Sequence, residues 1–169
     1  METCVHNEIE AIKHHGVYEE VDLPIGHKAL ENRWVFDKKS DGQYKACLVV
    51  EGFSQIEGID FDKIFSPVVH YETVCLILAL SALEDWHITG LDVKNTFLYG
   101  ELDEEIYMKR PEGYRIKGQE HRVWRLLKAL YGLKQAALVW WKALSQSMKV
   151  LGYTCLTTDA GVFVCHPEL

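Results

Sequence analysis

The sequence predicts one α+β domain with largely antiparallel strands. Two stretches have the pattern of strand, turn and strand that is typical of β-hairpins. Amphipathic helical periodicity appears near the beginning and again near the end of the chain. At 169 residues, with 48% hydrophobic and 25% charged residues, the chain is long enough to bury a core as a single unit.

The first third of the chain predicts a helix followed by a hairpin. Residues 2–15 place Val5, Ile9 and Ile12 on one helical stripe, and Gly16 is the expected stop. A short strand is expected over 17–21. Residues 33–36 and 44–50 then read as two strands that flank the turn Ser40-Asp41-Gly42. Residues 52–67 have no strong periodicity and predict an irregular surface segment.

The middle of the chain leads to one carboxylate. Residues 74–83 predict a helix that is hydrophobic nearly all round and is therefore expected to be buried. Residues 86–91 predict a strand with Trp86 and Ile88 turned inward and with Leu91 as a further candidate for the inward face. Asp92 follows at the end of this strand, and the spacing of 93–98 favours a short helical turn. On spacing alone, an aspartate in this position is more typical of a turn or a helix cap than of a ligand-binding site.

The last third predicts a second hairpin and a long helix. The hairpin joins residues 106–108 to 123–126 through a turn region with Pro111 and Gly113. The helix spans about 135–151 and ends at Gly152. Short strands are expected near Tyr153 and over 162–164, and Asp159 reads as a turn residue. The stripe of the helix consists of Trp140, Leu144, Met148 and Leu151.

Composition excludes several classes of protein. The longest apolar run, 74–80, is too short to cross a bilayer, and no signal peptide is recognisable. The 5 cysteines form no Cys-x-x-Cys pair, and the 8 histidines form no His-Glu-x-x-His motif. We therefore expect reduced thiols, an intracellular location (cytoplasmic or nuclear), no membrane partner, and no metal held by cysteine or histidine.

The charge of the chain is uneven. The net charge is −7, which is unfavourable for a nucleic-acid-binding protein. Residues 84–105 are strongly acidic, whereas residues 109–134 form a basic band. This band is compatible with contacts to a phosphate backbone and equally with a solvated hairpin face. Its proposed nucleic-acid-binding residues are Lys109, Arg110, Arg122, Arg125, Lys128 and Lys134.

Several motifs together resemble a known family. They are WVF at 34–36, KACLVVEGFSQ at 45–55, GIDFDKIFSPVV at 58–69, LDVKNTFLYGELDEEIYMKRPEGY at 91–114 and LKALYGLKQAALVWW at 127–141. In this order and spacing the chain resembles the copia-type retrotransposon reverse transcriptase. The resemblance implies a partial fingers-and-palm polymerase domain over 1–169. Residues 1–85 would be fingers-like with the first palm helix, and 86–169 would be palm-like.

The resemblance also implies a chemistry, RNA-directed DNA synthesis with two Mg²⁺ ions. Such ions activate the primer hydroxyl and stabilise the leaving pyrophosphate, and they prefer oxygen ligands. Asp92 matches the family's first metal-binding and catalytic aspartate, and the Val93 carbonyl would offer a second oxygen. Phe97 matches the ring that excludes ribonucleotides, and Gln135 matches a position beside the nucleotide and template. Without the resemblance, Phe97 is equally typical of an aromatic residue in the core. Gln135 is then typical of a polar residue at the N-terminus of a helix.

Other positions depart from the family's pattern. Cys47 and Glu51 stand where similar proteins carry Arg and Lys, although Lys45 remains to face the nucleotide. A thiol cannot replace a guanidinium fork, and a carboxylate repels phosphate. Ala137-Leu138 replaces a Pro-Arg pair, which removes another cation.

The sequence contains no Asp-Asp pair, so the family's Tyr-x-Asp-Asp motif is absent from it. We therefore expect a reverse transcriptase cut short before that motif, inactive alone and dependent on further polyprotein segments: the rest of the palm, RNase H and integrase. Its substrates would be an RNA or DNA template-primer and dNTPs. A non-catalytic nucleic-acid-binding remnant and a degenerate product without a role stay open as alternatives. Marginal stability and self-association are also expected.

Overall fold

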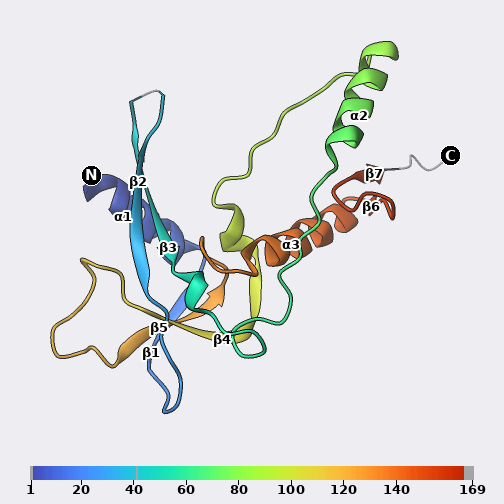
Figure 1. Ribbon diagram of the computed structural model, residues 1–169. Helices are drawn as coiled ribbons and strands as arrows, with labels where there is room; N and C mark the ends of the chain where they lie inside the picture. The colour runs from blue at the N-terminus through green and yellow to red at the C-terminus, as the bar shows by residue number, and fades with distance from the viewer. Residues whose placement is uncertain (1, 41, 166–169) are drawn as a thin grey trace.

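The computed structural model describes residues 2–40 and 42–165 and confirms the predicted mixed α+β fold with antiparallel sheets (Figure 1). Its helices are α1 (Glu2–His14), α2 (Tyr71–Leu83) and α3 (Ala136–Val150), with short 3₁₀ turns η1 (Gly52–Ser54) and η2 (Thr96–Tyr99). Its strands are β1 (Tyr18–Asp22), β2 (Asn32–Lys38), β3 (Tyr44–Val50), β4 (Glu101–Lys109), β5 (Arg122–Lys128), β6 (Tyr153–Cys155) and β7 (Phe163–Cys165).

The largest sheet has the order β1-β5-β4, and both pairs are antiparallel. This confirms the hairpin predicted between 106–108 and 123–126. Trp124 of β5 is 2% exposed and stacks on Tyr18 of β1 with ring centroids 3.6 Å apart. Because Val21 pairs with Val123 and Met108 with Trp124, apolar side chains of adjacent strands lie opposite one another.

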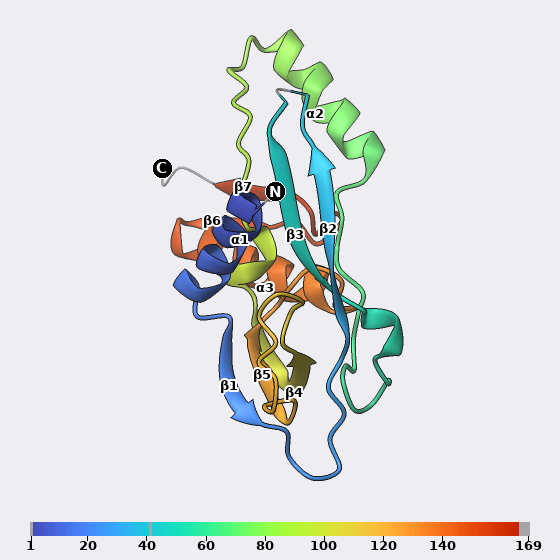
Figure 2. The ribbon, with the colours of Figure 1, turned by 90° about the vertical axis from the view of Figure 1, so that its left-hand side faces the viewer.

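The β2–β3 hairpin is also as predicted, with Trp34 opposite Leu48. Asp41 of its predicted turn lies outside the described residues. Helix α1 lies against β3 (Figure 2) and buries Ile9 and Ile12 in the same core as Leu48. This core joins α1, the two larger sheets, η2 and the first turns of α3.

The prediction that the helix over 74–83 is buried is wrong. Helix α2 forms, but it projects from the body (Figures 1 and 2), and Ser81 is its one buried residue. Leu76 is 60% exposed and Leu78 is 50% exposed. A helix that is apolar all round needs neighbours on every side. The described elements do not supply them.

The prediction of an inward-facing strand over 86–91 is also wrong. These residues form no regular structure, and Trp86, Ile88 and Leu91 are 56%, 59% and 92% exposed. A strand needs a partner to bond its backbone amides and carbonyls, and no described strand lies beside this segment. Asp92 therefore follows an irregular segment. The predicted helical turn after it does form, as η2.

The C-terminal part confirms the long helix and the short β6–β7 pair. The stripe predicted for this helix is offset: Ala136 and Val139 are buried, whereas Leu151 is 67% exposed. Asp159 forms a turn, as predicted, in which its carboxylate accepts a hydrogen bond from the Gly161 amide at 3.1 Å. The other carboxylate oxygen accepts one from the His70 amide at 3.0 Å, so this turn caps the N-terminus of α2.

The side chain of Thr73, in the first turn of α2, also donates a hydrogen bond to Asp159. This bond is the main reason that the pKa of Asp159 lies below its usual range, with the amide bonds adding to it. The division at residue 85 into a fingers-like and a palm-like part stays a prediction.

Candidate functional site

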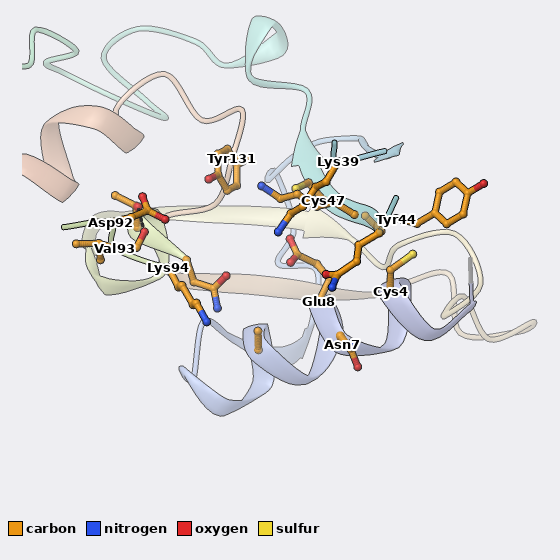
Figure 3. Close-up of a pocket in the computed structure, with 16 residues that line it drawn as sticks. Cys4, Asn7, Glu8, Lys39, Tyr44, Cys47, Asp92, Val93, Lys94 and Tyr131 are labelled. Atoms are coloured by element: carbon orange, nitrogen blue, oxygen red, sulfur yellow. Dashed lines mark hydrogen bonds between the residues drawn. The ribbon is translucent and has the colours of Figure 1, made fainter. Parts of the chain in front are cut away.

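A cleft of about 620 Å³ lies between α1, the β2–β3 hairpin and the segment 92–96 (Figure 3). Figure 3 shows Asp92 and Val93 on one side of the cleft and Glu8, Tyr44 and Cys47 on the other. Three of the predicted site residues, Lys45, Asp92 and Val93, line this cleft although they are distant in sequence. The other lining residues are Cys4, Asn7, Ala11, Lys39, Gln43, Ala46, Lys94, Asn95, Thr96 and Tyr131.

The segment that carries Asp92 is shaped by a tight turn. Asn95 has the left-handed φ of 55°, which asparagine tolerates better than most residues. The Thr96 hydroxyl donates to the Val93 carbonyl at 2.8 Å, and Leu98, 4% exposed, anchors the following turn in the core. Asp92 itself is exposed, and no hydrogen bond or ion pair joins it to another described residue. Its carboxylate is therefore free to meet a ligand.

Tyr131 forms another wall of the cleft because its loop is held against β3. The Val50 amide donates to the Tyr131 carbonyl at 2.8 Å. Gly132 follows with φ +93°, and a Cβ atom there would lie 2.0 Å from the Val50 carbonyl oxygen. Only glycine fits this close approach. Sequence reasoning did not single out Tyr131, because a tyrosine before a loop glycine carries no distinctive signal.

Phe97 does not line the cleft directly. Its ring meets the Tyr131 ring edge-on, with centroids 4.7 Å apart and planes at 80°. Phe97 is half-buried and packs against the core, as expected for a core aromatic residue. Its ring also supports Tyr131 in the wall of the cleft. Its predicted role against the nucleotide sugar stays a prediction.

The opposite wall comes from one face of β3. Side chains alternate along a strand, so Lys45 and Cys47 face the cleft while Leu48, 0% exposed, enters the core. The Lys45 ammonium hydrogen-bonds the Cys47 thiol. Burial, together with the nearby Glu8 carboxylate, raises the pKa of Cys47 despite that lysine. The thiol is therefore favoured over the thiolate.

The side chains that line the cleft carry a small positive excess. Lys39, Lys45 and Lys94 face the two carboxylates Glu8 and Asp92. Ammonium groups around a concave site attract phosphate anions. Glu51, which like Cys47 departs from the pattern that the sequence resembles, does not line the cleft, so its carboxylate is not among these charges.

Gln135 lies outside this cleft. It is 2% exposed, and its side-chain nitrogen donates to the Asp60 carbonyl at 2.9 Å while its oxygen accepts from Gln55 at 3.0 Å. It borders a second cavity of about 420 Å³ together with Leu138, Asp62, Lys63, Asp103, Glu104, Val139 and Lys142. Gln135 thus links the segment 55–60, which follows β3, to the start of α3. A contact of Gln135 with nucleotide or template stays a prediction.

The basic band is largely bonded within the molecule. Arg110 is 5% exposed and contacts Glu20 at 2.8 Å, and Arg125 contacts Glu19 at 2.9 Å. Arg122 and Lys128 donate to backbone carbonyls, as does Lys134, and Lys109 pairs with Glu31. Phosphate contacts by these side chains would compete with these bonds. Their role in nucleic-acid binding stays a prediction.

The residues around Asp92 do not complete a magnesium site. Within residues 2–40 and 42–165, no group of three or more His, Cys, Asp or Glu side chains is placed to hold a metal ion. Asp92 offers one carboxylate, and the Val93 carbonyl already accepts the Thr96 hydrogen bond. Two Mg²⁺ ions need more oxygen ligands than this. None of the helices in the described residues is long and apolar enough to span a membrane.

The chain matches the family model described as reverse transcriptase (RNA-dependent DNA polymerase) over residues 15–167. It is similar to the retrovirus-related Pol polyprotein from transposon TNT 1-94 of Nicotiana tabacum, at 45% identity over 95% of this chain and 12% of that protein. It is also similar to the corresponding polyprotein from transposon RE1 of Arabidopsis thaliana, at 37% identity over 94% of this chain and 11% of that protein.

The chain therefore spans about a tenth of the length of these two curated relatives, 12% and 11%. No solved structure matches it significantly.

Proposed function

Because this chain belongs to the reverse transcriptase family of copia-type Pol polyproteins, we propose that it forms part of a polymerase active site. Its cleft would hold the triphosphate of a dNTP, and Asp92 would be the first catalytic carboxylate. One observation carries this proposal. Lys45 from the β2–β3 hairpin and Asp92 with Val93 from the distant segment before η2 face the same cleft.

The side chains of the cleft suit a nucleotide. Lysine ammonium groups at three positions, Lys39, Lys45 and Lys94, provide a positive field for the phosphates. Tyr131 offers an aromatic wall that Phe97 holds in place through its edge-on contact. Asp92 has no described partner and lies exposed where a metal-bound phosphate would arrive. Binding and orienting the nucleotide are therefore the tasks that this part of the site performs.

The 169-residue polypeptide alone is expected to be catalytically inactive. Reverse transcriptases use Mg²⁺, and within the described residues no group of three or more His, Cys, Asp or Glu side chains is placed to hold a metal ion. The sequence contains no Asp-Asp pair that would supply further carboxylate ligands. Further segments of a Pol polyprotein would complete the site and would help to bind the RNA or DNA template-primer.

The test is a primer-extension assay on an RNA template with Mg²⁺ and dNTPs. The chain is assayed alone and after fusion to the segment that follows the matching region in the tobacco relative. We expect no synthesis by the chain alone and measurable synthesis by the fusion. Synthesis by neither would refute the catalytic part of the proposal, and synthesis by the chain alone would refute the need for further carboxylates.

A further inference from the structure

Glu8 places a carboxylate in the cleft, and nothing in the sequence pattern of α1 sets it apart. Its neighbour Ile9 is 1% exposed in the core, which fixes the orientation of the helix. The Leu48 amide donates a hydrogen bond to a Glu8 oxygen at 3.3 Å, which ties the carboxylate to β3. Glu8 is half-buried and lines the same cleft as Asp92. The carboxylate is therefore a fixed part of the wall.

Glu8 lines the same cleft as Lys45, the lysine that the proposed function assigns to the nucleotide phosphates. Burial raises the pKa of Glu8, and the hydrogen bond from the Leu48 amide and the positive charge of the nearby Lys45 only partly oppose this effect. Lys45 also hydrogen-bonds the Cys47 thiol, and that thiol is itself close enough to Glu8 to feel its charge. Glu8, Lys45 and Cys47 thus form one cluster where α1 meets β3. Figure 3 shows Glu8 and Cys47 on the same side of the cleft.

We propose that Glu8 competes with the nucleotide triphosphate for Lys45 and so sets the affinity of the cleft for polyphosphate anions. This inference rests on the proposed function, because it concerns the same cleft. Ionised Glu8 reduces the positive excess of the cleft by one charge and draws the Lys45 ammonium toward α1. A triphosphate that enters must draw Lys45 away from this attraction. The affinity of the cleft for triphosphate is therefore lower than it would be if the cleft contained its three lysines and Asp92 but no Glu8 carboxylate.

The test measures binding of inorganic tripolyphosphate to the full chain by isothermal titration calorimetry at low ionic strength and neutral pH. Glu8→Gln removes the charge but retains an oxygen that can accept the Leu48 hydrogen bond. We expect it to bind tripolyphosphate about three- to tenfold more tightly than the parent chain. Glu8→Ala is expected to change the affinity in the same direction, and Lys45→Gln to weaken binding.

The double variant E8Q/K45Q separates competition for Lys45 from a general change in charge. If Glu8 acts through Lys45, Glu8→Gln gives little further gain once Lys45 is replaced. Glu10→Gln is the matched control because Glu10 lies on the same helix, is exposed and pairs with Lys13. It is expected to leave the affinity unchanged. Thermal melts confirm that each variant is folded.

The outcomes distinguish two failures. Unchanged affinity in Glu8→Gln together with weaker binding in Lys45→Gln would overturn the role of Glu8 and leave the cleft assignment standing. Equal tightening by Glu8→Gln and Glu10→Gln would also overturn it, because net charge alone would then be responsible. Unchanged binding in Lys45→Gln, or no binding by any variant, would refute the cleft as a triphosphate site and the inference with it.

Discussion

At the scale of single residues, Gly132 decides whether Tyr131 can form a wall of the cleft. Its φ of +93° and the 2.0 Å approach of a hypothetical Cβ to the Val50 oxygen leave no room for a side chain. Gly132→Ala is expected to lower the free energy of unfolding by about 2–4 kcal/mol, through backbone strain and displacement of the loop. Urea denaturation measures this loss.

Gly113 gives a matched control, since its φ of +88° is similar but nothing lies within 4 Å of a Cβ atom there. Gly113→Ala should cost only the backbone strain, about 1 kcal/mol. Equal losses in the two variants would show that contact with Val50 is unimportant.

Glu8 also gives the stability a pH dependence. Burial raises its pKa in the folded state, so the ionised carboxyl favours the unfolded state. Protonated Glu8 is more favourable to the folded state than ionised Glu8, so this contribution to stability is present at low pH. It is lost as the pH rises from the pKa of Glu8 in the unfolded chain through its pKa in the folded chain. Glu8→Gln should therefore be more stable than the parent near pH 7, and this advantage should shrink near pH 4. Denaturant titrations at both values test this, and an advantage that does not depend on pH would contradict it.

At the scale of elements, β1 is held to the sheet by two neighbouring ion pairs of different burial. Glu20 contacts Arg110, which is 5% exposed, whereas Glu19 contacts Arg125, which is 38% exposed. Glu20→Ala would leave a buried guanidinium without its carboxylate and is expected to cost about 1–3 kcal/mol. Glu19→Ala should cost less than Glu20→Ala, because solvent screens the exposed pair of Glu19 with Arg125. Chemical denaturation measures the free energy of unfolding of both variants. A larger loss for Glu19→Ala would contradict the expectation that the ion pair with the more buried arginine contributes more to stability.

Helices and strands could be predicted from the sequence where the residues that pair with them or end them are close in the chain. Both hairpins, the first helix and the stop at Gly152 were predictable, because turn residues and periodicity record them. Prediction failed for the burial of α2 and for the strand over 86–91. An apolar sequence indicates that burial of the segment would be favourable, but it does not show whether other elements are present to cover it. Of the site, Asp92, Val93 and Lys45 were predictable from motifs, whereas Glu8 and Tyr131 enter the cleft through packing that no motif records.

At the scale of the whole molecule, exposed large apolar side chains are most frequent over residues 53–93, that is, on α2 and on the irregular segments before and after it. Leu76, Leu78 and Leu83 are 60%, 50% and 79% exposed. Surface of this kind favours association. We expect the isolated chain to self-associate, and Leu76→Glu to reduce the associated fraction while preserving the helix, since glutamate is a good helix former.

Light scattering coupled to size-exclusion chromatography measures the associated fraction. Val150→Glu, at a 79% exposed position at the end of α3, is the control and should have little effect. A monodisperse monomer with a cooperative melt would contradict the expectation of self-association.

The central claim is that Asp92 is the first catalytic carboxylate of a reverse transcriptase site. The most direct measurement is primer extension by the fusion with the continuing segment of the tobacco relative, comparing Asp92→Asn with Asp85→Asn. Asp85 is exposed, lies seven positions earlier and has a φ of 53° that asparagine also adopts. We expect Asp92→Asn to lower the rate by about a thousandfold or more and Asp85→Asn to leave it nearly unchanged. Undiminished synthesis by the folded Asp92→Asn fusion would contradict the assignment of Asp92 as a catalytic carboxylate.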